Sequence, residues 1–244
     1  MDIKVAVLTG CTRGIGKAVF KRLAAQGVSV AGVYHRDEEA ADLFRNEAEE
    51  AGIPWMLEKF DVCEFDRIPD FIQKVDGRLG RIDYLLNNVG VDNAAGILEV
   101  TPEQWKRSQD TILNVPLFFM KAVIPRMRSR HFGRIVNIGA SSKDYLKGAA
   151  GLGPYGVHKA ALEVLTKTAA LEEISNGITV NMVAPGSTAG AGTLPEEERI
   201  PVDKIPLGRR VDVEEVAEAV MYFFSEKSGA VTGQFLGVNG GLST

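Results

Sequence analysis

The 244-residue chain has the length of one large α/β domain or two small ones, and its hydrophobic fraction of 45% allows a sizeable core. The net charge of −4 argues against a general nucleic-acid-binding protein, because such proteins gather Lys and Arg to neutralise phosphates. Cys11 and Cys63 form neither a zinc pattern nor a disulfide framework, so we expect no metal. The absence of a signal-peptide pattern and of a long apolar stretch favours a cytoplasmic protein without membrane contact.

Short apolar runs alternate with longer segments of helical period along the whole chain. In chain order, this pattern predicts a strand at 3–9, a helix at 16–26, a strand at 28–34, a helix at 38–51, a strand that ends before Asp61, a strand at 82–87, a long helix at 102–130 kinked at Pro116, a strand at 134–139, a helix at 155–175, a strand at 178–184, a helix at 213–225 and a strand at 235–238.

Such alternation, with strands that are apolar almost throughout, is typical of a parallel sheet covered on both faces. We therefore predict an α/β fold with a Rossmann-type doubly wound parallel β-sheet flanked by helices. Residues 1–244 contain no recognisable linker or repeat, which favours a single domain. The segment at about 186–210 is rich in small residues, Pro and charge, and we expect it to form a substrate loop.

A glycine-rich turn with the spacing GxxxGxG follows the first predicted strand and opens the first helix. Glycines permit a tight turn and let a pyrophosphate approach the positive amino terminus of the helix. The same spacing can form a plain tight turn, but its place in an alternating fold favours a dinucleotide site. The predicted contacts in this turn are Gly10, Thr12, Arg13, Gly14, Ile15 and Gly16.

The residues after the second predicted strand bear on the choice of dinucleotide. NAD-selective sites hold the ribose 2′-hydroxyl with a carboxylate at this point. Here the strand ends in Tyr34-His35-Arg36, and no carboxylate occurs until Asp37. Arg13 and Arg36 can hold a 2′-phosphate between their guanidinium groups, although two solvated arginines would look the same in the sequence. NADP(H) is therefore favoured over NAD(H).

Several motifs occur in a fixed order with this turn: Asn87-Asn88-Val89-Gly90, Tyr155-Gly156-Val157-His158-Lys159, Pro185-Gly186 and the ending Thr232-Gly233-Gln234…Val238-Asn239-Gly240-Gly241. Together they cover nearly the whole chain, which resembles the short-chain dehydrogenase/reductase family, especially its 3-oxoacyl-[acyl-carrier-protein] reductases. The resemblance implies an NAD(P)-dependent enzyme that interconverts a ketone and a secondary alcohol. It also implies that the cofactor contacts Asp61 and Val62 at the adenine, and Asn88, Val89, Gly90, Pro185, Gly186 and Thr188 elsewhere.

Tyr155 and Lys159 are four residues apart on a predicted helix, so their side chains share a face. A phenol ionises near pH ~10, and an adjacent ammonium favours the phenolate that proton transfer needs. Tyr-x-x-x-Lys alone is often a surface pair, but its place after the fifth strand predicts catalysis. The resemblance implies that Lys159 also binds the nicotinamide ribose, and that Asn114 anchors a water beside it. Asn114 can alternatively stabilise the kink at Pro116.

The serine that should hold the substrate carbonyl is the point at which the sequence departs from the family. Counting thirteen residues back from Tyr155 gives Ser142, whereas counting forward from the fifth strand gives Ala140. Ser141 lies between the two registers. An oxyanion donor contributes strongly to such reactions, so we expect Ser142, with Ser141 as the alternative, to be catalytic.

The resemblance favours a 3-oxoacyl-carrier-protein reductase, and Arg126, Arg128 and Arg130 are candidates to meet an acidic acyl carrier protein. Asn176 stands where such reductases tend to carry a second docking arginine, which weakens this partner. A sugar, polyol, steroid-like or xenobiotic carbonyl is an alternative substrate, and a non-catalytic NADPH-binding regulatory protein is an alternative function. Family members of this size imply a homo-oligomer, with a tetramer expected.

Overall fold

The computed structural model describes residues 3–90, 95–140, 150–190 and 200–242. A seven-stranded sheet with the order β3-β2-β1-β4-β5-β6-β9 forms its centre, and every neighbouring pair of strands is parallel. This sheet confirms the predicted doubly wound α/β fold. The strands are β1 (Val5–Thr9), β2 (Ser29–Tyr34), β3 (Trp55–Lys59), β4 (Tyr84–Asn87), β5 (Gly133–Ile138), β6 (Ile178–Pro185) and β9 (Phe235–Val238).

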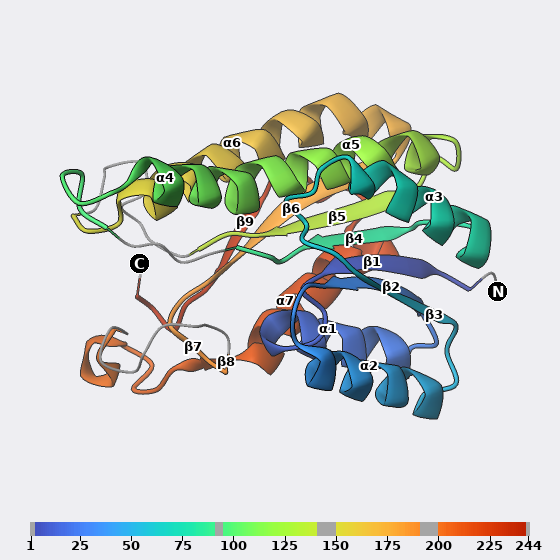
Figure 1. The fold of residues 1–244 in the computed structure, drawn as a ribbon, viewed down its shortest axis with the longest axis horizontal. Helices are drawn as coiled ribbons and strands as arrows, with labels where there is room; N and C mark the ends of the chain where they lie inside the picture. Colours follow the sequence, from blue (N-terminus) through green and yellow to red (C-terminus); the bar gives the residue numbers. More distant parts are fainter. Residues whose placement is uncertain (1–2, 91–94, 141–149, 191–199, 243–244) are drawn as a thin grey trace.

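Helices cover both faces of the sheet (Figure 1). One face carries α1 (Gly14–Ala25), α2 (Glu38–Glu50) and α7 (Val213–Phe224). The other carries α3 (Arg67–Leu79), α4 (Pro102–Gln109), α5 (Val115–Arg128) and α6 (Gly153–Glu173).

Side chains alternate between the two faces along each strand, so the sheet contributes to one hydrophobic core on each face. In β1, Ala6 and Leu8 pack with the side chains of α1 and α7, whereas Val5 and Val7 pack with those of α3 and α5. Successive side chains of a strand point to opposite faces, so a strand covered on both sides must be apolar throughout. This explains why near-continuous apolar runs identified the strands.

The structure corrects the predicted elements in three places. Helix α3 was not predicted, although its fully buried Ile68, Phe71, Ile72 and Val75 have helical spacing. The predicted helix at 102–130 is interrupted by a π-helical turn, η1 (Asp110–Asn114). This irregular turn comes just before Pro116, which lacks a backbone N–H and cannot continue a regular helical ladder.

The third correction concerns the predicted loop at 186–210. Its described part contains β7 (Thr188–Ala189), which pairs in parallel with β8 (Val211–Asp212) in a small separate sheet. Three short 3₁₀ turns complete the described elements: η2 (Ile174–Asn176), η4 (Val202–Lys204) and η5 (Glu226–Ser228).

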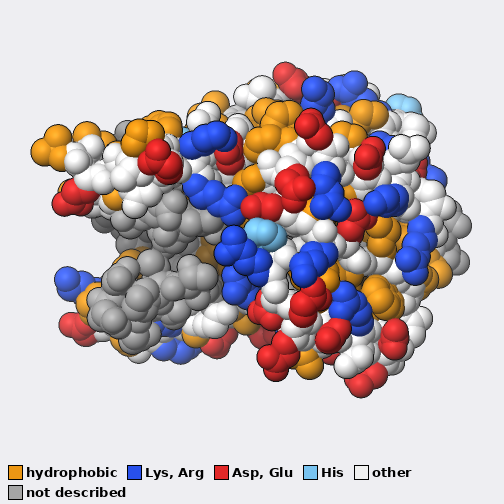
Figure 2. Space-filling view, viewed as in Figure 1, with side chains coloured by type: hydrophobic (Ala, Val, Ile, Leu, Met, Phe, Trp, Pro, Cys, Tyr) orange, Lys and Arg blue, Asp and Glu red, His pale blue; other side chains and the backbone are white. Residues whose placement is uncertain are grey.

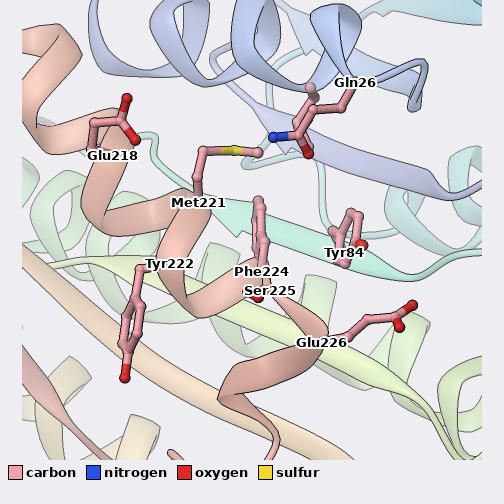
Figure 3. Close-up of a pocket in the computed structure, with 9 residues that line it drawn as sticks. Gln26, Tyr84, Glu218, Met221, Tyr222, Phe224, Ser225 and Glu226 are labelled. Atoms are coloured by element: carbon pink, nitrogen blue, oxygen red, sulfur yellow. The ribbon is translucent and has the colours of Figure 1, made fainter.

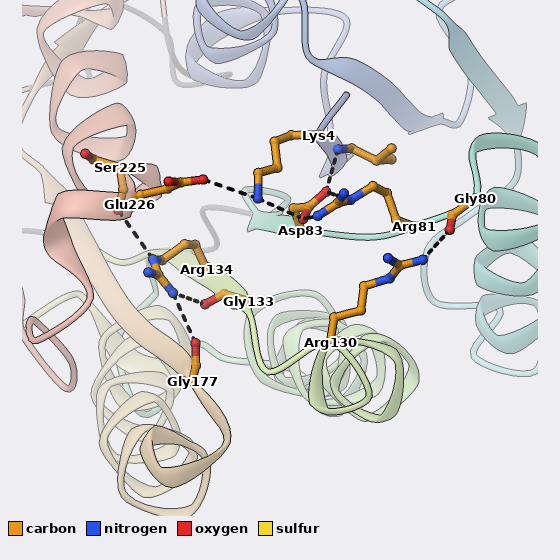
Figure 4. Close-up of polar contacts among 11 residues, drawn as sticks. Lys4, Gly80, Arg81, Asp83, Arg130, Gly133, Arg134, Gly177, Ser225 and Glu226 are labelled. Carbon is orange, nitrogen blue, oxygen red and sulfur yellow. Dashed lines mark hydrogen bonds and ion pairs between the residues drawn. The ribbon is translucent and has the colours of Figure 1, made fainter. Parts of the chain in front are cut away.

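Buried charged side chains form hydrogen bonds with backbone groups at the amino-terminal ends of the strands (Figure 4). The fully buried Asp83 accepts hydrogen bonds from the Val5 backbone N–H at 2.9 Å and from Arg81 Nε at 2.7 Å. Arg134 of β5 donates to the carbonyls of Gly133 at 2.8 Å and Gly177 at 3.2 Å. A buried carboxylate is tolerated because its donors replace the lost water.

Candidate active site

In parallel doubly wound sheets, ligands bind at the carboxyl ends of the strands, where the strand order reverses. Here that point is β1, which lies between β2 and β4. The glycine-rich turn follows β1 directly. Gly10 and Gly14 have φ values of +68° and +56°, a backbone region that favours glycine.

Position 16 requires a glycine because there is no room for a side chain, and not because of its φ angle. A Cβ at this position would lie 2.1 Å from the carbonyl oxygen of Gly10 and 3.0 Å from Nδ2 of Asn88. The turn therefore folds tightly against the start of α1, which leaves the backbone N–H groups at the helix terminus available to an anion. Thr12 and Ile15 are buried, whereas Arg13 is exposed at the helix N-cap.

Asn88 holds the glycine-rich turn by hydrogen bonds to Thr9 and Gly10. Its Nδ2 donates to the carbonyl oxygens of Gly10 at 3.1 Å and Thr9 at 3.2 Å. Its backbone N–H donates to Oγ1 of Thr9 at 2.9 Å. These contacts give Asn88 a structural role in the turn. The adjacent Val89 is partly buried, and Gly90 is exposed.

Lys159 is the buried cation of the site. Its side chain comes from α6, and the residue is only 6% exposed. Nζ donates to the carbonyl oxygen of Ile138, the last residue of β5, at 2.7 Å. The same Nζ lies 5.6 Å from the centre of the Tyr155 ring. An added Cβ on Gly90 would lie 3.5 Å from this nitrogen, so Gly90 lies close to the ammonium.

Tyr155 and Lys159 thus share a face of α6, as their spacing predicts. The neighbouring His158 is buried, and its Nδ1 lies 3.0 Å from Oγ of Ser108 on α4. Burial lowers the pKa of His158, which disfavours its charged form.

Asn114 ends the π-helical turn beside α6. Its Nδ2 donates to Oδ1 of Asp110 at 2.9 Å, and Asp110 also pairs with Lys106. Ile112 of the same turn packs with Leu162, and Tyr155 packs against this cluster. The Asp110 contact was missed in the sequence, although an Asp four residues before an Asn on a helix could have indicated it.

Asp61 lies beyond the end of β3 and is held from two sides. Its Oδ1 accepts from the Cys63 backbone N–H at 3.0 Å, and its Oδ2 accepts from Nη1 of Arg107 at 3.2 Å. Nδ1 of His35 is 3.8 Å from Oδ2. Partial burial opposes ionisation, but the Cys63 N–H and Arg107 outweigh it and lower the pKa of Asp61. Arg107 was not predicted to belong to the site.

The predicted 2′-phosphate residues are exposed cations. Arg36 follows β2, Arg13 caps α1, and neither guanidinium has an ion-pair partner among the residues that the structure describes. Figure 2 shows Lys and Arg side chains gathered beside a histidine in the middle of the view. Val62, next to Asp61, is buried.

Pro185 ends β6 beside the last strand. Gly186 donates its backbone N–H to the carbonyl of Val238 at 2.9 Å, and an added Cβ would lie 2.7 Å from Cα of Asn239. Thr188 is buried, and its Oγ1 donates to the carbonyl of Gly186 at 3.0 Å. The candidates Ser141 and Ser142 lie outside the described residues, as do residues 191–199 of the predicted substrate loop.

A cavity of about 520 Å³ lies at the other end of the sheet, between α1 and α7 (Figure 3). Its lining includes Tyr84, Glu218 and Glu226. The two carboxylates already pair with Arg22 and Lys4, so they offer little to a ligand. Within the described ranges, no cluster of His, Cys, Asp and Glu could hold a metal, and no helix is long and apolar enough to cross a membrane.

Known proteins match this chain over nearly its whole length. A family model described as enoyl-(acyl carrier protein) reductase matches residues 10–243. An acetoacetyl-CoA reductase of Rhizobium meliloti is 39% identical over 243 residues, which cover 98% of each chain. The chain belongs to the short-chain dehydrogenase/reductase family.

Other members agree with this assignment. The 3-oxoacyl-[acyl-carrier-protein] reductase FabG of Thermotoga maritima is 36% identical over 252 residues, covering 99% of this chain and 98% of that protein. The crystal structure of acetoin dehydrogenase YohF from Salmonella typhimurium has a TM-score of 0.86 and 30% identity, covering 98% of this chain and 96% of that one. This short-chain dehydrogenase/reductase is therefore an oxidoreductase that acts on carbonyl or hydroxyl groups, which confirms the predicted enzyme class.

Members of this family use NAD(P)H, and the residues at the carboxyl edge of the sheet in this short-chain dehydrogenase/reductase fit such a dinucleotide. The turn excludes side chains at Gly10 and Gly16, where a pyrophosphate needs close approach to the backbone. The buried Lys159 lies near Gly90, on the other side of the switch point. The glycine-rich turn and Lys159 together therefore suit an elongated anion that runs across the carboxyl edge of the sheet.

Proposed function

We propose that this protein is an NADPH-dependent reductase of 3-oxoacyl thioesters, of the kind named among its relatives. One observation carries the proposal: the buried Lys159 ammonium, held by the Ile138 carbonyl, lies 5.6 Å from the Tyr155 ring. A phenol next to a buried cation is suited to give a proton to a carbonyl oxygen and to recover it from solvent. The same pair argues against the alternative of a non-catalytic NADPH-binding protein.

In the proposed reaction, Tyr155 donates the hydroxyl proton to the substrate oxygen as the ketone becomes a secondary alcohol. When bound, NADPH supplies the reducing equivalents. Lys159 stabilises the phenolate that Tyr155 leaves, and Asn114 helps to anchor the water through which the phenol regains its proton. Ser142, or Ser141 in its place, holds the carbonyl oxygen.

Two groups of residues are proposed to hold the cofactor. The pyrophosphate is held by Gly10, Thr12, Gly14, Ile15 and Gly16. The nicotinamide half is flanked by Asn88, Val89, Gly90, Pro185, Gly186 and Thr188.

The arginines considered for carrier-protein docking already have partners within the chain. Arg128 pairs with the buried Glu173, which also accepts from Asn176 at 3.1 Å. Arg126 pairs with Asp76 at 3.3 Å, and Arg130 donates to the Gly80 carbonyl at 2.7 Å. Breaking such contacts would offset the gain from an acidic partner. These contacts favour a coenzyme A thioester over a carrier-protein thioester as substrate.

The substrate class can be tested by NADPH oxidation with three carbonyl compounds: acetoacetyl-CoA, acetoacetyl carrier protein and the thiol-free ketone acetoin. We expect kcat/KM for acetoacetyl-CoA to exceed that for acetoin at least about tenfold, because the carrier adds binding contacts that a small ketone lacks. We expect the carrier-protein form to be no better than the coenzyme A form. A higher kcat/KM for acetoin, or no oxidation with any of the three compounds, would contradict the thioester proposal.

The preference for NADPH is a separate prediction. Arg36→Ala should weaken NADPH binding about 10- to 100-fold, since it removes a charge-assisted contact to the 2′-phosphate. NADH lacks this phosphate, so its Kd should change less than about threefold. Fluorescence titration of the wild type and the variant with both cofactors measures the effect. Equal wild-type affinities for NADPH and NADH would rule out the proposed role of Arg13 and Arg36.

A further inference from the structure

Arg107 makes a long-range contact above the carboxyl edge of the sheet. It belongs to α4, which follows β4, whereas its partner Asp61 follows β3 at the edge of the sheet. The contact therefore spans the ends of β2 and β1, where the dinucleotide crevice lies. Nη1 of Arg107 is 3.2 Å from Oδ2 of Asp61 and 3.2 Å from Sγ of Cys63.

The Asp61 carboxylate is fixed but still has capacity to accept. The Cys63 backbone N–H reaches Oδ1 and Arg107 reaches Oδ2, and the Cys63 thiol also hydrogen-bonds to the carboxylate. A carboxylate offers about four lone-pair sites, so this one can accept a further hydrogen bond. The side chain is 22% exposed, which leaves part of it open to a ligand.

The position of Asp61 relates it to the base rather than to the phosphates. In this fold the residues after β2 face the adenosine ribose. His35, the residue that follows β2, lies 3.8 Å from Asp61, one strand further from the switch point. Asp61 is thus placed beyond the ribose, on the side of the base. A carboxylate there matches the exocyclic amine of adenine, which can only donate.

We infer that Arg107 is a positioning residue for the adenine subsite, holding the Asp61 carboxylate as the acceptor for the exocyclic amine. This inference rests on the proposed use of a nicotinamide adenine dinucleotide. It differs from the role proposed for Arg13 and Arg36, because adenine is common to NADPH and NADH. Arg107 therefore contributes to recognition of the base, and Arg36 to recognition of the 2′-phosphate.

The test compares NADPH with its hypoxanthine analogue, in which the exocyclic amine is replaced by a carbonyl oxygen. That oxygen would face the Asp61 carboxylate with no proton to share, so the wild type should bind the analogue at least about tenfold more weakly. Arg107→Met releases the carboxylate and should reduce this preference to about threefold or less. It should weaken NADPH and NADH by similar factors. The readout is Kd from fluorescence titration, which needs no turnover.

Arg126→Met is the matched control, since it removes another helix arginine with one carboxylate partner, Asp76, away from the crevice. It should retain the wild-type preference for adenine. Arg107→Lys keeps the charge without the planar guanidinium and should give an intermediate preference, which serves if the Met variant folds poorly.

Three outcomes would overturn the inference: equal wild-type binding of the two bases, a wild-type preference retained in Arg107→Met, or a loss confined to NADPH over NADH. The last would assign Arg107 to the phosphate instead. A wild type that binds no dinucleotide would overturn the proposed function itself, which is a distinguishable result.

Discussion

Tyr155→Phe is expected to lower kcat about 10²- to 10⁴-fold while the Kd for NADPH changes less than about twofold. The phenyl ring can still pack with Ile112 and Leu162 and remain beside Lys159. Only the hydroxyl is lost, and with it the group proposed to give the proton to the substrate. Steady-state kinetics together with NADPH titration separate the two effects.

Two variants sharpen this prediction. Tyr222→Phe removes the hydroxyl of a tyrosine that is 52% exposed on α7, and it should leave kcat unchanged. Lys159→Ala should lower both kcat and NADPH affinity, because Lys159 is proposed to serve both the phenolate and the cofactor ribose. Full activity of Tyr155→Phe would exclude the proposed proton transfer altogether.

Gly16→Ala should cause the second large loss, in both dinucleotide affinity and stability. The new Cβ would lie 2.1 Å from the Gly10 carbonyl oxygen, which is backbone and cannot rotate away. The turn must open, so we expect NADPH affinity to fall at least tenfold, on the order of 10²-fold, as the backbone N–H groups move. Overpacking of this kind typically costs about 1–3 kcal/mol of unfolding free energy. Denaturant unfolding and NADPH titration measure the two quantities.

Gly77→Ala provides the control for this substitution. Gly77 lies within α3, and nothing lies within 4 Å of an added Cβ. Alanine is the better helix former by about 1 kcal/mol, so this variant should be equally or more stable and bind NADPH normally. If Gly16→Ala behaved in the same way, the tight packing of the turn would not matter for binding.

The strands and the placement of Tyr155 and Lys159 on one face of α6 could be predicted because local periodicity encodes them. Strand β9 occurs at 235–238 as predicted, and Tyr155 and Lys159 share a face because helical spacing places residues four apart together. The family and the fold follow from motifs in a fixed order. The roles of the individual site residues stay predictions, as does the tetramer.

What the sequence did not reveal depends on contacts between distant segments. Arg107 and Asp61 are 46 residues apart and meet because the segments that follow β4 and β3 both lie at the carboxyl ends of the strands. The sequence predicts a kink at Pro116 but not the π-helical turn η1 before it, whose Ile112 packs with Leu162 of α6. Helix α3 is different, since its apolar spacing was present in the sequence and was overlooked.

The buried Asp83 and Arg134 lie at the amino-terminal ends of the strands, whereas the glycine turn and Lys159 lie at the carboxyl ends. The contacts that stabilise the strands and the groups proposed for catalysis therefore lie at opposite ends of the strands. Loops at the carboxyl end can lengthen or change composition without disturbing the ion pairs that hold the strands together. Such a division lets one scaffold diversify its reactions over evolution. Directed evolution of substrate range should accordingly randomise the carboxyl-end loops and leave the Asp83 cluster intact.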